Sequence, residues 1–179
     1  MQTWHAVAIL LGVVVVAYVA MWRGWRGRAT KHDLPPLVPV PAVDALPTAK
    51  VSGGARYFGT TVAGDWLDRV VAQGLGARSQ CRLNLSSEGL DVIRLAGSFR
   101  IPAAALRGAR HDQGIAGKVV PPHGLLVVTW QHGEHTLDTG FRLTDTSRPG
   151  VEDKGVASVR QAHNAWIRAI SKLAKERSQ

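Results

Sequence analysis

The sequence predicts a mainly β fold: a small β-barrel or curled antiparallel sheet that ends in an amphipathic helix and follows one transmembrane helix. Three observations predict it. Residues 4–22 form one long apolar run, residues 56–144 alternate apolar and polar side chains in short runs, and residues 159–173 change to a helical period. With 179 residues, the chain has room for one folded domain after the apolar run and a linker are set aside.

The apolar run from Trp4 to Trp22 holds 19 residues without a formal charge. A helix of that length rises about 28 Å, which is close to the thickness of the hydrocarbon core of a bilayer. A cleaved signal peptide is the alternative. However, no basic residue precedes the run, and Tyr18-Val19-Ala20 has tyrosine where a small residue would precede the cut. We therefore expect a membrane span that is kept in the mature protein.

The residues that flank this run predict its orientation. Indole side chains favour the membrane interface, and basic side chains favour the cytoplasmic side. Because the nearby basic residues all follow the run, we expect a single-pass protein of the plasma membrane with its N-terminus outside and its domain in the cytoplasm. The same basic cluster can also attract anionic headgroups. The expected interface residues are Trp4, Trp22, Arg23, Trp25, Arg26 and Arg28.

Five prolines between Lys31 and Lys50 indicate a linker. Proline lacks a backbone donor and biases the preceding residue toward extended structure, so we expect a semi-rigid spacer of at most about 60 Å. Its PPLVPVP stretch also contains a PxxP ligand pattern, which is the alternative use. The expected organisation is an external N-terminus at 1–3, a transmembrane helix at 4–22, a basic juxtamembrane and Pro-rich linker at 23–50, and the folded domain at 51–179.

Short strands are expected throughout the folded domain. The first is RYFGTTV, which ends near Gly64, and a short helix capped by Asp65 follows as far as Leu75. A brief helical turn is expected at residues 103–109. The other predicted strands are the hairpin CRLNLS and LDVIRL, the run 98–101, and the later runs GIAGKVV, GLLVVTWQ and TLDTGFRLT, which makes about seven strands in all.

The last stretch predicts an amphipathic helix. Its apolar stripe consists of Val159, Ala162, Trp166, Ile170 and Leu173. The basic residues of this stretch lie mainly off the stripe, so they form a solvated outer face.

A short barrel finished by one amphipathic helix has the element order of the pleckstrin-homology-like (PH-like) fold, in which the helix plugs one open end. The chain also resembles actinobacterial single-pass membrane proteins of unassigned activity that carry a proline-rich linker and a bacterial PH-like domain. The matching stretches cover about half of the folded region. They are RYFGTTVAGDWLDRVVAQGLGAR, IPAAALRGARHDQGIAGKVV and GLLVVTWQHGEHTLDTGFRLT. The resemblance implies the fold and the topology, and it implies no catalytic residues.

No catalytic signature is present. The sequence has no GxSxG, GxxxxGK[ST] or HExxH motif, and the single Cys81 cannot form a CxxC pair. His132, Glu134 and His135 are conceivable metal ligands, but one hairpin turn would have to supply nearly the whole coordination shell, so an exposed polar turn is favoured. We therefore expect no enzyme, no cofactor and no metal.

The candidate binding residues are charged side chains of residues 107–118 and of the last predicted strand. They are Arg107, Arg110, Lys118, Asp138 and Arg142, which form either an anion-binding rim or ordinary surface ion pairs. The net charge of +9 is concentrated at the two ends of the chain, with +4 in residues 23–31 and +3 in residues 151–179. A nucleic-acid-binding domain would concentrate this charge on its folded part, so we expect no nucleic acid as a partner.

Tether, spacer, barrel and missing catalytic residues together predict a membrane-anchored, non-enzymatic module. We expect it to bind a protein partner or a lipid headgroup at the inner face of the membrane. An accessory or scaffold subunit of a cytoplasmic enzyme or membrane transport complex is the second hypothesis. A hydrolase or transferase is the third.

Overall fold

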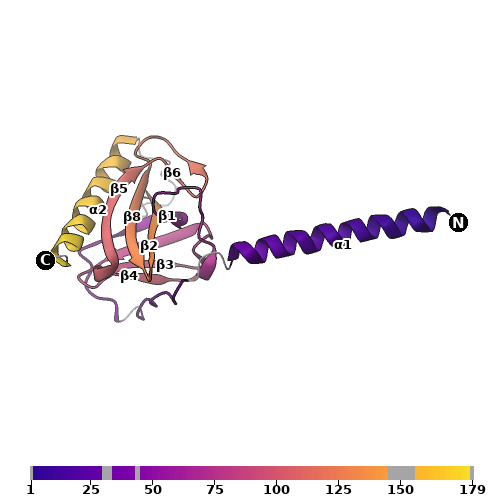
Figure 1. Cartoon of the computed structure of the whole chain (residues 1–179). Helices are drawn as coiled ribbons and strands as arrows, with labels where there is room; N and C mark the ends of the chain where they lie inside the picture. The colour runs from indigo at the N-terminus through magenta and orange to yellow at the C-terminus, as the bar shows by residue number, and fades with distance from the viewer. Residues whose placement is uncertain (1, 30–33, 43–44, 145–155, 178–179) are drawn as a thin grey trace. The chain divides into compact units, whose positions relative to one another are not determined.

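The computed structural model describes residues 2–29, 34–42, 45–144 and 156–177. The chain divides into two compact units, Met1–Asp33 and Leu34–Gln179. Figure 1 shows their elements, which in chain order are α1 (Gln2–Ala29), β1 (Val51–Val62), the 3-10 turn η2 (Ala72–Gly74), β2 (Ser79–Leu85), β3 (Gly89–Arg94), β4 (Phe99–Pro102), the 3-10 turn η3 (Ala103–Ala105), β5 (Leu106–Asp112), β6 (Gly114–Ile115), β7 (Lys118–Val119), β8 (Leu125–His132), β9 (His135–Thr144) and α2 (Val156–Arg177).

The helix α1 contains the apolar run and continues seven residues past Trp22. Its 28 residues rise about 42 Å. The segment Val7–Gly24 has a mean hydropathy of 2.1, and none of it is buried. By length and composition, α1 can therefore cross a membrane. Among the expected interface residues, Trp4, Trp22 and Arg23 are exposed, whereas the side chains of Trp25, Arg26 and Arg28 lie outside the described residues.

Seven strands form one antiparallel sheet in the order β4-β3-β2-β1-β9-β8-β5. The strands β4 and β5 stand at the two ends of this order, so hydrogen bonds do not close the sheet into a barrel. Side chains from both halves nevertheless share one core, in which the Tyr57 ring of β1 contacts Phe99 of β4 and Phe141 of β9 edge to face. In a flat sheet Phe99 could not reach Tyr57, because β4 is three strands away from β1, and Figure 1 shows that the sheet is curled. The predicted curled antiparallel sheet is confirmed.

Most predicted strands are present, and the prediction differs from the structure between residues 103 and 120. The hairpin of β2 and β3, the strand β4, and the final pair β8 and β9 match the prediction. The expected helical turn at 103–109 is only η3, because the chain becomes the strand β5 from Leu106 and pairs with β8. The run GIAGKVV is not one strand but a tight hairpin, β6 and β7, that turns at Ala116 and Gly117.

The helix predicted from Asp65 to Leu75 is wrong. The Asp65 carboxylate does accept the backbone N–H of Leu67 at 3.0 Å, as a capping residue would, but the chain then turns back to β1. Val70 N donates to Thr60 O at 2.9 Å, and Thr60 N donates to Leu75 O at 3.2 Å. Pairing with β1 therefore takes the backbone groups that a helix would have used, and it buries Val70 and Leu75 in the core.

The terminal helix α2 is confirmed and packs mainly against β5 (Figure 1). Trp166, Ile170 and Leu173 are buried, as the stripe predicts. Ala162 is exposed instead, and the neighbouring His163 takes the buried position.

Part of the expected linker belongs to the folded unit. Leu34 is buried in the main core, and the backbone of Val38 pairs with Arg100 at the free edge of β4. Further along, Lys50 N donates to Leu85 O at 2.7 Å and leads into β1. The compact unit thus begins at Leu34 rather than at residue 51.

Candidate functional site

The hairpin of β6 and β7 covers part of the outer face of the sheet. Along β9, Leu137 and Phe141 face the main core, so the alternating residues Asp138 and Gly140 face outward. Ile115 of the hairpin lies over Gly140. This contact belongs to a second, smaller core, formed by Phe58, Ile115, Ala116, Leu125 and Val127.

The connection between β1 and β2 fixes the hairpin from a second side. The Arg69 guanidinium donates to Ala116 O at 2.6 Å, and Gly117 N donates to Trp66 O at 3.4 Å. The Trp66 ring lies against Gly114, where a Cβ would be 3.3 Å from the ring. This loop therefore positions Trp66, which is 45% exposed, beside the hairpin.

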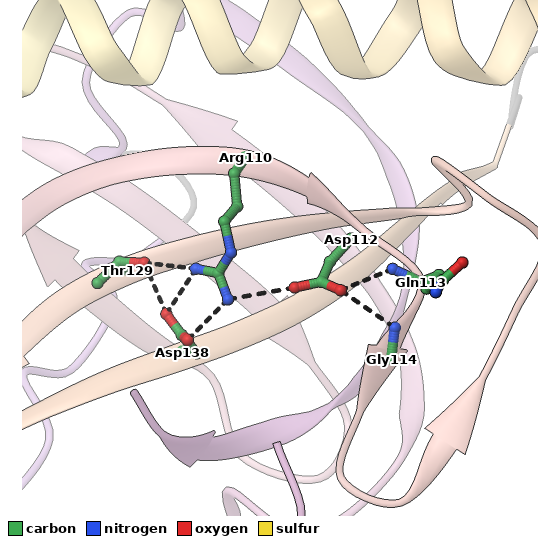
Figure 2. Close-up of polar contacts among 6 residues, drawn as sticks. All are labelled: Arg110, Asp112, Gln113, Gly114, Thr129 and Asp138. Carbon is green, nitrogen blue, oxygen red and sulfur yellow. Dashed lines mark hydrogen bonds and ion pairs between the residues drawn. The ribbon is translucent and has the colours of Figure 1, made fainter. Parts of the chain in front are cut away.

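Arg110 of β5 organises the polar side of this region (Figure 2). Its guanidinium donates to both carboxylate oxygens of Asp138, at 3.1 and 2.9 Å, and to Asp112 at 3.2 Å. Thr129 accepts a further bond from Arg110 at 3.0 Å and donates to Asp138 at 2.6 Å. Three neighbouring strands, β5, β8 and β9, supply these groups, because their register places Thr129 opposite Asp138.

The charges of this cluster determine what it can bind. The Asp138 side chain is only 6% exposed, whereas that of Arg110 is 48% exposed. The hydrogen bond to Asp138 is the main cause that raises the pKa of Arg110, so the guanidinium stays charged. One cation faces two carboxylates, and the cluster therefore carries a net charge of about −1. Such a cluster does not favour an anionic ligand.

An open pocket of about 410 Å³ lies between the hairpin and this cluster. It combines the half-exposed Trp66 and the exposed Val119 with the charged groups of Arg110 and Asp112. Its lining consists of Gly64, Trp66, Arg110, Asp112, Gln113, Gly114, Val119 and Asp138. An aromatic and an aliphatic side chain beside charged groups suit a protein side chain better than a small anion.

The structure brings together two of the five predicted binding residues, Arg110 and Asp138. Arg107 is exposed on β5 and donates to Ala104 O at 2.9 Å, outside the pocket. Lys118 is exposed next to Val119 but does not line the pocket, and Arg142 lies further along β9, opposite Arg56. The cation that pairs with Asp138 is therefore Arg110.

Sequence reasoning missed Trp66, Val119 and Thr129, whereas Asp112 is a candidate partner of Arg110 from the sequence and does contact it. Trp66 lies in the predicted helix that does not form, and Thr129 meets Asp138 only through the register of β8 and β9. Arg110 and Asp112 are two residues apart on one strand, so their side chains share a face, and this spacing is the sequence signal for their pairing.

Two buried groups that could act as nucleophiles, Cys81 and Tyr57, are kept in their protonated form. Burial raises the pKa of the Cys81 thiol to about 11 and that of Tyr57 to about 12, so both stay protonated at neutral pH. In the described part of the chain, no cluster of three His, Cys, Asp or Glu side chains could hold a metal ion. His132, one of the conceivable ligands, instead forms a hydrogen bond with Pro35 O at 2.7 Å.

Comparison with known proteins agrees with the architecture. The model of the family described as "Bacterial PH domain-like" matches residues 34–168, about three quarters of the chain. A comparison with curated proteins finds no match. The matched region begins at Leu34, where the compact unit also begins, and contains every strand of the sheet. The curled sheet with its terminal helix, together with this match, places the chain in the bacterial PH domain-like family.

Proposed function

We propose that this protein is a membrane-anchored, non-enzymatic binding module that recruits a protein partner at the inner face of the membrane. The pocket of Trp66, Val119 and the Arg110 cluster carries the proposal. Exposed aromatic and aliphatic side chains beside a cluster of net negative charge suit an apolar or basic side chain of a partner. Membership of a PH-like family supports a binding role in general.

A lipid headgroup is the less favoured ligand for this pocket. Headgroup recognition needs unpaired cations, and the pocket's cation, Arg110, is already bonded to Asp112 and Asp138. The partner of the proposed module is a protein. The second hypothesis, an accessory or scaffold subunit of a cytoplasmic enzyme or membrane transport complex, also requires a protein partner.

The anchor in this proposal is α1. Because the basic residues follow its apolar segment, the positive-inside rule favours a cytoplasmic domain. A reporter fused after Gln179 should therefore behave as cytoplasmic, and one fused before Met1 as external. Digestion of the domain by a protease added to intact cells would contradict this orientation.

Purification from cells in mild detergent tests the recruitment itself. We expect a stoichiometric protein to accompany the wild type and to be lost from Trp66→Ala. The matched control is Leu67→Ala, because Leu67 is 61% exposed in the same loop but does not line the pocket. A partner that both variants retain would place its site elsewhere, and co-purification of lipid alone would favour headgroup binding.

A further inference from the structure

Residues 34–38, which we call the strap, lie in a seat built by three parts of the PH-like unit. These parts are the connection between β1 and β2, the turn between β8 and β9, and the free edge of β4. Leu34 is buried in the main core, whereas Pro35, Pro36 and Val38 are exposed. Leu37 is partly buried against the same core. Three of the five strap side chains are exposed, so polar contacts add to the attachment that Leu34 and Leu37 provide.

Gln73 provides most of these polar contacts. Its side-chain amide donates to Leu34 O at 2.9 Å and to Pro35 O at 2.6 Å, and its Oε1 accepts Leu37 N at 2.7 Å. Its backbone has φ of +53°, which is uncommon for a residue other than glycine. Strained residues often occur at functional contacts, and this one presents its side chain to three backbone groups of the strap.

The other two parts of the seat also contact the strap. His132 forms a hydrogen bond with Pro35 O at 2.7 Å, and the Pro35 ring packs on Gly133, where a Cβ would lie 3.1 Å from the ring. At the β4 edge, Arg100 N donates to Val38 O at 2.8 Å. The strap thus extends the sheet by one bridge and covers an edge that would otherwise be open.

The position of the strap in the chain gives it a consequence for anchoring. Five peptide steps separate Ala29, the end of α1, from Leu34, and they can span at most about 18 Å. Without the strap contacts, 22 steps would separate Ala29 from Val51, the start of β1. A proline-rich chain of that length reaches about 70 Å in the extended polyproline form.

We propose that the strap is a latch that sets the length of the tether between α1 and the PH-like domain. When the strap is docked, only five peptide steps connect α1 to the domain. When the strap is released, the whole linker connects them, so the domain can move further from α1. Three prolines at positions 35, 36 and 39 keep the segment extended when free, so docking orders little additional chain. The consequence for membrane distance rests on the proposed anchoring by α1, but the latch itself does not.

Amide hydrogen exchange of the full chain in detergent micelles tests the docking. In the wild type, we expect the amides of Leu37 and Arg100 to be protected. Gln73→Ala should raise the exchange rate of Leu37 at least tenfold and also expose Arg100, while the pairing of β1 with β9 stays protected. The matched control is Gln80→Ala, an exposed glutamine on β2, which should leave both amides unchanged.

A second variant distinguishes the loss of the Gln73 side-chain hydrogen bonds from an effect of backbone strain at residue 73. Gln73→Gly accommodates the positive φ without cost and removes the same side chain, so it should release the strap even if Gln73→Ala folds poorly. Wild-type protection of Leu37 in the folded glycine variant would overturn the proposal. So would exchange of Leu37 in the wild type at the rate of an unstructured peptide.

The tether length is measured by paired spin labels at Gly24→Cys and Gly108→Cys, two positions where added side chains meet open space. The native Cys81 is buried and stays protonated, so it should not take up label. We expect the distance distribution to be longer and broader with Gln73→Gly than in the wild type. Identical distributions would overturn the latch, and they would do so whether or not a partner binds the pocket.

Discussion

Gly140 of β9 lies directly beneath Ile115, so that a Cβ on Gly140 would stand 2.7 Å from Ile115 Cγ2 and 2.9 Å from its Cδ1. This close approach seats the hairpin of β6 and β7 on the outer face of the sheet. The hairpin in turn forms one wall of the pocket through Gly114 and Val119. A single glycine therefore links the packing of the sheet to the candidate binding site.

Gly140→Ala should displace the hairpin and destabilise the domain by about 1 to 3 kcal/mol, as overpacking usually does. Gly108→Ala is the matched control, because a Cβ on Gly108 meets nothing within 4 Å. Urea unfolding of the full chain in mild detergent, followed by near-ultraviolet circular dichroism, measures both. Equal midpoints for the two variants would show that the hairpin does not depend on this contact.

Trp166→Ala should lower the free energy of unfolding by about 3 to 5 kcal/mol, because it removes a large buried ring. Trp166 is 4% exposed and reaches Gly53 of β1, so it joins α2 to the core. The comparison variant is Trp66→Ala, which removes a half-exposed ring and should cost about 1 kcal/mol or less. If Trp166→Ala unfolds at the wild-type midpoint, α2 does not contribute to the core.

Arg110→Ala should cost more stability than Asp138→Ala. The first change leaves the buried Asp138 carboxylate without its cation, whereas the second leaves a half-exposed guanidinium that water can solvate. We expect a difference of about 1 to 2 kcal/mol in the free energy of unfolding. If Asp138→Ala is the more destabilising change, then an unpaired Arg110 guanidinium costs more stability than an unpaired Asp138 carboxylate, which contradicts this prediction.

The stability of the domain should fall in acid through His163. Burial lowers the pKa of His163 to about 4, and the nearby charges of His111 and Arg142 act in the same direction. The unfolded chain, with a histidine pKa of about 6.5, then binds more protons than the folded chain between pH 6.5 and pH 4. Stability is therefore full above about pH 6.5 and lost as the pH falls, by about 3 kcal/mol in total.

His163→Gln should remove this part of the pH dependence, although it also alters the bonds to His123 O and Leu143 N. His5→Gln, in α1 and outside the domain, is the matched control and should keep the wild-type slope. If the wild type and His163→Gln give parallel profiles of unfolding free energy against pH, the pH dependence does not come from His163.

The sequence was sufficient where a side-chain period decides the structure. The alternation of TLDTGFRLT predicted β9, and the spacing of Trp166, Ile170 and Leu173 predicted α2. It failed where long-range pairing overrides a local pattern. Residues 65–75 have helical spacing, but the backbone bonds between Thr60 and Val70 and between Thr60 and Leu75 exist only once β1 has formed.

The candidate site was only partly predictable for the same reason. Arg110 and Asp138 could be selected as charged residues able to form ion pairs, but their pairing with each other depends on three strands in register. The strap was missed because prolines predict an extended chain equally well whether it is free or docked. Only the hydrogen bonds of Gln73 in the folded structure show that the segment is docked on the domain.

Photo-cross-linking from the pocket in intact cells tests the central claim, recruitment of a protein, most directly. A photoreactive amino acid at Val119, which is 71% exposed and lines the pocket, should give one dominant protein adduct that Trp66→Ala abolishes. The same amino acid at Arg82, exposed on β2 outside the pocket, should not give it. No protein adduct from residue 119, or the same adduct from both positions, would contradict recruitment through this pocket.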